Sequence, residues 1–208
     1  GRDSGKRINA ENNWWGTVDV RQVQAEIWDY QNNGNNPSVD YIPYLDGPNG
    51  NPVPGNYVQG TIISNTTWSL ANSPYIVIGN ILVNNGVTLT VEAGVEIKFD
   101  GNYKMTINGA LDAQGTAVEM IKFTSNKGTP AKGDWDQIYF GDYSDDSKCI
   151  LKYAVIEYGK TVVNINTASP RIENSTIKNN LNSGISVYNG SPRIQNNTIQ
   201  NNNTGLYF

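Results

Sequence analysis

An internal repeat constrains the fold of this chain more than any other feature of its sequence. The stretch 169–180, SPRIENSTIKNN, returns 22 residues later at 191–202 as SPRIQNNTIQNN, with nine of twelve positions identical. A period of this length is too short for a pair of helices, and it is rich in Ile, Val, Thr and Asn. Short alternating apolar runs in each copy are broken by Asn, Gly and Ser-Pro turns. We therefore predict an all-β fold, a parallel β-helix (β-solenoid) with three short strands in each coil.

The repeat also predicts which side chains face the interior of the solenoid. Successive coils of a β-helix stack about 4.8 Å apart as parallel strands, so alternate residues point inward. Asn residues are expected at the turns, because Asn tolerates left-handed backbone. The residues that mark the strands of the last two coils are Ile172, Ile177, Ile185, Val187, Ile194, Ile199, Leu206 and Phe208.

The chain divides into three zones by composition. Residues 1–45 form an N-terminal segment that we predict to be a strand, a short helix and an extended piece. Asp19 is the expected helix cap and Asn33-Gly34 the expected stop. Residues 46–60 are rich in Pro and Gly and are predicted to be a linker, and residues 61–208 form the β-helix body. The apolar residues at helical spacing are Val20, Val23, Ile27 and Tyr30.

Charge and hydropathy argue against several classes of partner. The net charge is -4 and only 16% of the residues are charged, so no basic stripe is present to neutralise nucleic-acid phosphates. The apolar runs are only a few residues long, too short to span a membrane. The single cysteine, Cys149, lies in an apolar run and is expected to be a buried thiol, since one cysteine makes no internal disulfide.

The body contains several distinctive motifs, which are TTW at 66–68, GVTLTVEAGV at 86–95, GDW at 133–135 and YAVIEYG at 153–159. These motifs resemble those of pectate-lyase-like right-handed parallel β-helix proteins of bacterial and archaeal cell surfaces. In that family a segment like NWWG at 13–16, followed by a helix and a strand like YIPYL at 41–45, typically closes the C-terminal end. Here the closing segment comes first. The resemblance implies a right-handed β-helix in a secreted, cell-surface protein more firmly than any activity.

The permuted order suggests that units join head to tail. The last coil presents an open strand edge and an apolar cross-section, which solenoids normally cover. If the N-terminal segment of one unit adds strands to this edge, each unit caps its neighbour. Such a contact joins two different surfaces and therefore propagates into a filament unless it closes a ring. The predicted partner is thus the chain itself, with no cofactor.

The residues expected to carry this assembly form two sets. The predicted donor residues are Ile8, Ala10, Trp14, Trp15, Val20, Val23, Ile27 and Trp28. The predicted acceptor residues are Ile194, Ile199, Leu206, Tyr207 and Phe208. Two alternatives stay open. The segment folds back onto its own solenoid and caps the first coil near Gly60, or the chain is one module of a longer tandem array.

Catalysis is a weaker interpretation of this sequence, and we expect no enzymatic activity. With no His in the chain, a His base, a His metal ligand and a His proton shuttle are all excluded. The segment 141–147, GDYSDDS, offers oxygen ligands but lacks the spacing of a known calcium loop, so a solvated turn is expected and no metal is assigned. The acidic residues that could serve glycoside cleavage are Asp134, Asp136, Asp142, Asp145 and Asp146.

Carbohydrate binding by a cell-surface or adhesin module is the alternative function. Aromatic rings stack on sugars when they line one outer face, although large aromatics often simply pack in a core, which is the interpretation we favour for Trp135. The candidate aromatic residues are Trp68, Trp135, Tyr139, Tyr143, Tyr153 and Tyr158. Five Asn-x-Ser/Thr triplets are also candidate glycan acceptors, and they begin at Asn65, Asn174, Asn189, Asn196 and Asn202.

Overall fold

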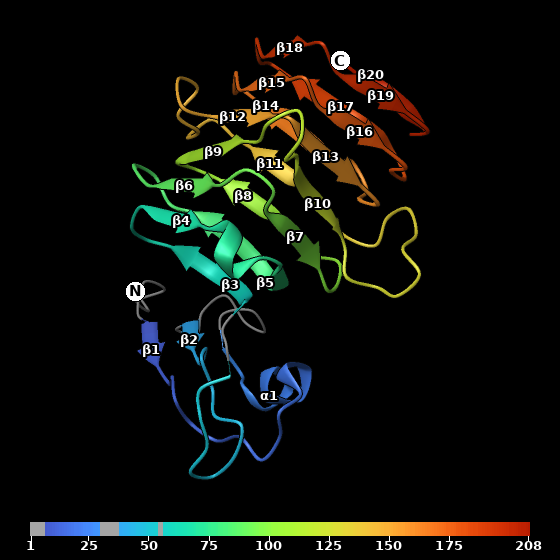
Figure 1. Ribbon diagram of the computed structural model, residues 1–208. Coiled ribbons are helices and arrows are strands. Elements are labelled where there is room, and N and C mark those ends of the chain that lie inside the picture. Colours follow the sequence, from blue (N-terminus) through green and yellow to red (C-terminus); the bar gives the residue numbers. More distant parts are fainter. Residues whose placement is uncertain (1–6, 30–37, 54–55) are drawn as a thin grey trace.

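The computed structural model describes residues 7–29, 38–53 and 56–208 of the chain. Residues 57–207 wind into a parallel β-solenoid of the right-handed type with about seven turns (Figure 1). The all-β parallel β-helix predicted from the 22-residue repeat is therefore confirmed. Right-handed winding is the usual consequence of joining parallel strands of L-amino acids through crossovers.

Three faces of parallel strands form the wall of the solenoid, and each coil contributes one strand to each face. The first face contains β4 (Thr66–Trp68), β6 (Thr88–Val91), β9 (Ala110–Gln114), β12 (Ile150–Lys152), β15 (Arg171–Glu173) and β18 (Arg193–Gln195). The second contains the first half of β5 (Tyr75–Val83), then β7 (Glu96–Phe99), β10 (Ile121–Ser125), β13 (Ala154–Glu157), β16 (Thr176–Lys178) and β19 (Thr198–Gln200). The third contains the second half of β5, then β8 (Met105–Ile107), β11 (Ile138–Phe140), β14 (Val163–Asn166), β17 (Ser183–Tyr188) and β20 (Thr204–Tyr207). Strand β3 (Tyr57–Ile62) opens the solenoid by pairing with β5, and a short 3-10 helix, Leu70–Asn72, precedes β5.

The register between coils stacks like residues on like. Ile172 lies opposite Ile194, and Ile177 lies opposite Ile199. In the interior coils the inward-facing residues are fully buried, as expected. The final coil differs, because no further coil of the described residues covers it, and Leu206 is 38% exposed. Phe208 follows β20 and is 79% exposed.

The turns are made by asparagines in left-handed backbone, as the repeat predicts. Positive φ angles between 51° and 57° occur at Asn174, Asn179, Asn189, Asn196 and Asn201. In a left-handed conformation the side chain of Asn is tolerated far better than that of a branched residue. These residues therefore form corners of the last coils without a glycine, whereas Gly86 and Gly94 have positive φ in the earlier coils.

Stacked aromatic residues form part of the solenoid core. Trp135 is fully buried, lies parallel to Phe99 with ring centroids 4.1 Å apart, and donates its indole N–H to the carbonyl of Glu157 at 2.8 Å. Trp68 stacks on Tyr75 with centroids 4.9 Å apart. Cys149 is fully buried, as expected, and burial raises the pKa of its thiol to about 11.

The N-terminal segment contains a two-stranded parallel sheet and one short helix. Strand β1 (Arg7–Asn9) pairs with β2 (Ser38–Asp40), and helix α1 spans Val20–Glu26. The carboxylate of Asp19 accepts from the backbone N–H of Arg21, so the predicted cap is present. The helix ends where Ile27 becomes extended; Tyr30 and Asn33-Gly34, expected to continue and stop it, lie outside the described residues.

This segment packs on the first coil of its own solenoid. Val23 of α1 is fully buried in a cluster with Tyr41, Tyr44 and Ile78, and Ile78 belongs to β5. The side chain of Gln24 donates to the carbonyl of Ile78 at 2.7 Å. Figure 1 shows α1 and the two short strands lying below β3 and β5. The apolar face of the helix is therefore covered by the first coil of the same chain. This arrangement corresponds to the alternative in which the N-terminal segment folds back onto its own solenoid.

The segment expected to be a linker is partly structured. Leu45 forms an isolated antiparallel bridge with Pro52, and the backbone N–H of Asp46 donates to the carbonyl of Asn51. Strand β3 begins at Tyr57, inside the predicted range 46–60. The solenoid therefore starts a few residues before the composition changes.

Candidate functional site

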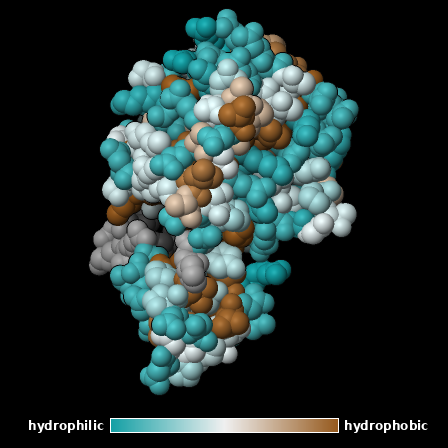
Figure 2. All heavy atoms as spheres, in the orientation of Figure 1, coloured by the Kyte–Doolittle hydropathy of each residue, from teal (hydrophilic) through white to brown (hydrophobic). Residues whose placement is uncertain are grey.

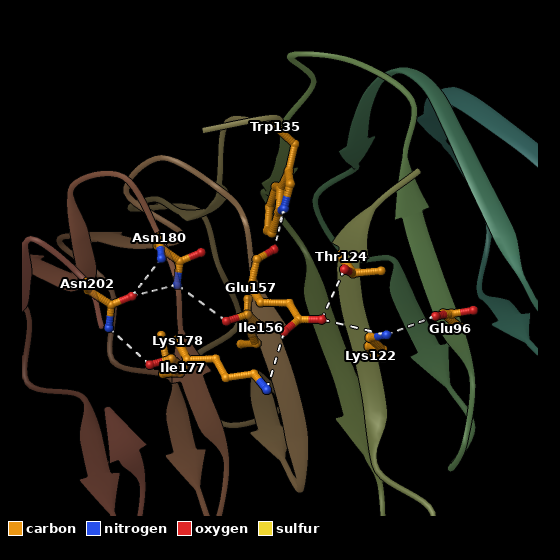
Figure 3. A network of polar contacts seen from close by, with 10 residues as sticks. All are labelled: Glu96, Lys122, Thr124, Trp135, Ile156, Glu157, Ile177, Lys178, Asn180 and Asn202. Atoms are coloured by element: carbon orange, nitrogen blue, oxygen red, sulfur yellow. Dashed lines mark hydrogen bonds and ion pairs between the residues drawn. The ribbon is translucent and has the colours of Figure 1, made fainter. Parts of the chain in front are cut away.

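A row of asparagine side chains ties each of the last coils to the coil before it. The Oδ1 atom of Asn202 accepts from the N–H of Asn180 at 3.0 Å, and its Nδ2 atom donates to the carbonyl of Ile177 at 3.0 Å. Asn180 repeats the arrangement one coil earlier, accepting from the N–H of Gly159 and donating to the carbonyl of Ile156 (Figure 3). Each asparagine thus satisfies two backbone groups of the preceding coil.

A second row follows the same rule at the neighbouring turn. Asn197 accepts from the N–H of Ser175 at 2.9 Å and donates to the carbonyl of Ile172 at 2.7 Å. Both rows therefore point backward along the solenoid. The equivalent groups of the last coil, such as the N–H of Asn202 and the carbonyl of Ile199, have no such side-chain partner among the described residues.

The predicted acceptor residues lie together on this last coil. Ile194 and Ile199 are half-buried and rest against the interior core, while Leu206 is more open. Tyr207 is 60% exposed, because its partner in register, Ser186, sits on the outer side of β17. Phe208 is exposed beyond the last strand. The last coil thus presents a partly apolar edge along β18, β19 and β20.

The predicted donor residues separate into two groups. Five contribute to the cluster beside the first coil: Ala10, Trp15, Val20, Val23 and Ile27. The other three do not join it: Ile8 and Trp28 are 48% and 73% exposed, and Trp14 is half-buried. The buried face of the helix is therefore covered within its own chain, and the donor residues that remain exposed are Ile8 in β1 and Trp28 after the helix.

Among the residues that the structure describes, strand β1 and the residues after it pair along one edge, with the segment that contains β2. The N–H of Ala10 donates to the carbonyl of Asp40 at 2.6 Å, and the N–H of Asn12 donates to the carbonyl of Pro43 at 2.7 Å. Asn12 has a φ of 56°, the same left-handed conformation as the turn asparagines of the body. The side chain of Asn13 is exposed and donates to the carbonyl of Ala10.

The outer side of the second face carries a row of alternating charges that the sequence did not single out. The carboxylate of Glu157 is nearly buried and lies 3.6 Å from the ammonium of Lys122 and 3.5 Å from that of Lys178. Thr124 donates its hydroxyl to the same carboxylate, and Lys122 also reaches Glu96 at 3.3 Å (Figure 3). A carboxylate held between two lysines is satisfied electrostatically, so this row stabilises the stacking of coils. Only the register between distant strands could have revealed it.

Three of the five acidic residues considered for catalysis, Asp134, Asp145 and Asp146, accept hydrogen bonds from backbone or side-chain groups near them. Asp134 is buried and accepts from the Ser125 hydroxyl, the Lys127 ammonium and the Ala131 N–H. Burial alone would raise the pKa of Asp134, but these hydrogen bonds outweigh it and leave the pKa below its ordinary value. Asp134 is therefore ionised and anchored at neutral pH.

The loop at 141–147 is held by similar contacts. Asp145 accepts from Lys148 at 2.8 Å and from the Ser147 hydroxyl at 2.6 Å, and these hydrogen bonds lower the pKa of Asp145. Asp146 accepts from the backbone N–H of Ser169 at 2.7 Å. Among the described residues no group of three or more His, Cys, Asp or Glu could hold a metal ion. Of the remaining two candidates, Asp136 is half-buried and Asp142 is exposed.

The aromatic residues considered for sugar stacking do not form one surface. Trp68 and Trp135 are core residues, so their assignment to sugar stacking is wrong, whereas packing of Trp135 is confirmed. Tyr143 is 67% exposed on the loop before β12. The other three, Tyr139, Tyr153 and Tyr158, are half-buried.

The five candidate glycan acceptors differ in the exposure and the hydrogen bonding of their side-chain amides. Asn65, Asn189 and Asn196 are exposed, and Asn174 is half-buried. The amide nitrogen of Asn202 is engaged with the carbonyl of Ile177. Because a glycan attaches through this nitrogen, modification of Asn202 would disturb the row of asparagine hydrogen bonds between coils.

Comparison with known proteins agrees with this geometry. Residues 60–140 match the family model of the pectate-lyase like beta helix domain. The chain is also 31% identical over 122 residues to Protein bark beetle of Drosophila melanogaster, a match that covers 52% of this chain and 4% of that protein. The similarity thus extends beyond bacteria and archaea. No solved structure matches the chain.

The fold limits the classes of function that this chain can have, but it does not identify an activity. Domains of this type include enzymes and non-enzymes and are often extracellular. Within residues 7–29, 38–53 and 56–208, no helix is long and apolar enough to cross a membrane. The chain is therefore consistent with a structural or carbohydrate-related surface protein. Residues 60–140 therefore resemble the pectate-lyase like beta helix domain, and the resemblance expected from the motifs of the body is confirmed.

Proposed function

We propose that this chain is a non-enzymatic structural protein of the cell exterior whose β-helix units join end to end. The observation that carries the proposal is the open edge of the last coil, where strands β18, β19 and β20 have no further coil to pair with among the described residues. Exposed parallel edges of this kind are templates for strand addition. The apolar side chains of Ile194, Ile199 and Leu206 add a surface that gains free energy when it is covered.

The donor in this proposal is the strand region 7–13 of a neighbouring unit. Helix α1 stays on its own first coil, because Val20, Val23 and Ile27 are already buried there. The segment thereby holds β1 in place next to the first coil and offers it to the preceding unit. The physical contact is the same whether the neighbour is a separate chain or the next module of a tandem polypeptide.

Sedimentation velocity of the 208-residue chain over a wide concentration range tests the proposal. We expect concentration-dependent growth into thin filaments, visible by negative-stain electron microscopy. Ile199→Glu places a charge on the open coil and should abolish growth, because the charge would be desolvated in the junction. Val118→Glu, at a loop position that is 91% exposed, is the matched control and should assemble normally. A wild-type chain that stays monomeric at every concentration overturns the proposal.

Carbohydrate binding remains a second candidate because two exposed tyrosines share the outer side of the third face. Tyr188 lies opposite Asn166 and is 66% exposed, and Tyr207 lies opposite Ser186 on the adjacent row. Figure 2 shows a mostly hydrophilic surface with small hydrophobic patches on both the solenoid and the N-terminal segment. Binding to immobilised polysaccharides that is lost in Tyr188→Ala but retained in Tyr143→Ala would favour this role.

A further inference from the structure

The two rows of asparagine side chains form what we call asparagine ladders, in which each rung is one asparagine that hydrogen-bonds to the preceding coil. Because every rung points backward, the last coil has no rung bonded to it among the described residues. Asn180 reaches back to the coil of Gly159, and Asn202 reaches back to the coil of Asn180. A further coil would therefore supply an asparagine whose side chain accepts from the N–H of Asn202 and donates to the carbonyl of Ile199. Such a pair of hydrogen bonds is specific, since one amide must match one donor and one acceptor three residues apart.

Residues 10–13, which follow β1, share the sequence pattern and the left-handed backbone of the residues that form a rung in the body. Residues 199–202 read Ile-Gln-Asn-Asn, and residues 10–13 read Ala-Glu-Asn-Asn. The first asparagine of each pair is left-handed, with a φ of 56° at both Asn201 and Asn12. The second asparagine is Asn202 in the body and Asn13 in the N-terminal segment.

The direction of hydrogen bonding also agrees. In the body, the N–H of the left-handed Asn179 donates forward to the carbonyl of Gln200 in the next coil. The N–H of Asn12 donates in the same way to the carbonyl of Pro43, which follows β2. The segment containing β2 therefore occupies the place of the coil after β1. Because peptide groups alternate along a strand, Asn9 and Glu11 direct theirs to the opposite edge, which corresponds to the backward edge of a coil.

We propose that residues 9–13 of one chain add to β19 of a second copy, with Asn13 forming the next rung on Asn202 and Ile199. This inference rests on the proposed end-to-end function and assigns its register. It places Ala10 over Ile199, and it places Glu11 over Gln200 in the row that contains Lys178. A carboxylate near Lys178 extends the alternation already made by Glu157 and Lys178.

Forming the junction exchanges contacts inside the segment for contacts between copies. In the single chain the Asn13 amide donates to the carbonyl of Ala10, and the N–H of Glu11 donates to the Asn9 side chain at 3.0 Å. Both are short-range bonds between exposed groups. Their replacement by a strand pairing and a ladder rung leaves the packing of α1 on the first coil unchanged.

Disulfide trapping between two variant chains tests the register. Chains carrying Glu11→Cys are mixed with chains carrying Gln200→Cys under mild oxidation, because residues opposite each other in adjacent strands lie within disulfide reach. We expect a covalent dimer of this pair. Gln195→Cys, exposed at the equivalent position of β18, is the matched partner and should not link. Linking of the β18 pair, or of neither pair, overturns the proposed register.

The affinity of the junction provides the second arm. Asn13→Ala removes the rung and should weaken assembly roughly tenfold, whereas Asn85→Ala at an exposed turn should leave it unchanged. Thermal unfolding of the dilute variants shows that each chain remains folded. If Asn13→Ala assembles like the wild type while Ile199→Glu does not, the end-to-end function stands and the ladder inference falls. If the wild type never assembles, both fall.

Discussion

At the scale of single residues, the carboxylate of Glu157 links charges from three neighbouring coils. Its carboxylate is nearly buried and contacts Lys122, Lys178 and Thr124. Glu157→Gln keeps the shape but leaves two lysines without their shared anion, so we expect a loss of about 1–3 kcal/mol in the free energy of unfolding. Urea unfolding measures it. Glu119→Gln, at an exposed position, is the control, and an equal loss in both variants would contradict the role of Glu157.

Asp134 gives the stability of the protein a defined dependence on pH. Because its pKa is lowered in the folded state, its contribution is complete above the unfolded pKa of about 4 and is lost as the pH falls through the folded value. We therefore expect Asp134→Asn to be less stable than the wild type at pH 7. The difference should shrink steadily below about pH 4. Thermal unfolding from pH 2.5 to 7 checks this, and a constant difference would show that Asp134 does not titrate in this way.

Residue positions that follow the strand alternation could be predicted from the sequence, and those that depend on register could not. Ile172, Ile177 and Cys149 lie in short apolar runs, and all three are buried as expected. Glu157 looks like an ordinary outward residue in its strand. Its burial arises because Lys122 and Lys178 come from neighbouring coils, and the sequence does not align those coils on each other. The packing of Trp135 in the core was predicted from the large size of its side chain, whereas the residues beside it in the sequence do not indicate burial.

At the scale of elements, helix α1 shows how a short helix depends on its partner. Seven residues form few intrahelical hydrogen bonds, so the helix is stabilised mainly by packing. Val23→Ala removes two buried methyl groups beside Ile78, and we expect the N-terminal segment to loosen by about 2 kcal/mol while the solenoid remains intact. Limited proteolysis should then cleave within residues 7–53 first. Val18→Ala, at a position 59% exposed, should leave the digestion pattern unchanged.

The existence of this helix was predictable, whereas its packing partner was not. The spacing of Val20, Val23 and Ile27 and the Asp19 cap identify the element. Ile78 is far away in sequence and belongs to a strand whose outward residues normally face water, so nothing local marks it as a partner. The same limit applies to β1, whose pairing with β2 joins residues 7–9 to residues 38–40.

At the scale of the whole molecule, the solenoid is a one-dimensional stack in which each coil contacts only its neighbours. The repeat at 169–202 therefore predicts the architecture of coils far from it, because every coil solves the same packing problem. It does not predict the long loops between β10 and β12, which lie outside the wall. One of these loops reaches the last coils, where Lys132 donates to the carbonyl of Asn201 and Gly133 approaches Leu181.

The stack also makes the effect of a substitution depend on whether a coil is covered. Ile177 and Ile199 occupy the same register position, but Ile177 is fully buried and Ile199 is half-buried on the open coil. In dilute monomer, Ile177→Ala should lower the free energy of unfolding by about 2–5 kcal/mol and Ile199→Ala by less than about 1.5 kcal/mol.

When units join, the stability of the protein should become more sensitive to the residue at position 199. At concentrations where chains assemble, Ile199 becomes an interior residue, and the neighbour stabilises the wild type by mass action. We therefore expect the midpoint of chemical unfolding to rise with protein concentration for the wild type and for Ile177→Ala, but much less for Ile199→Ala. A concentration-independent midpoint for all three proteins would contradict the junction. An equal rise in all three would show that units join through some other surface, since burial of the open coil is what makes position 199 sensitive.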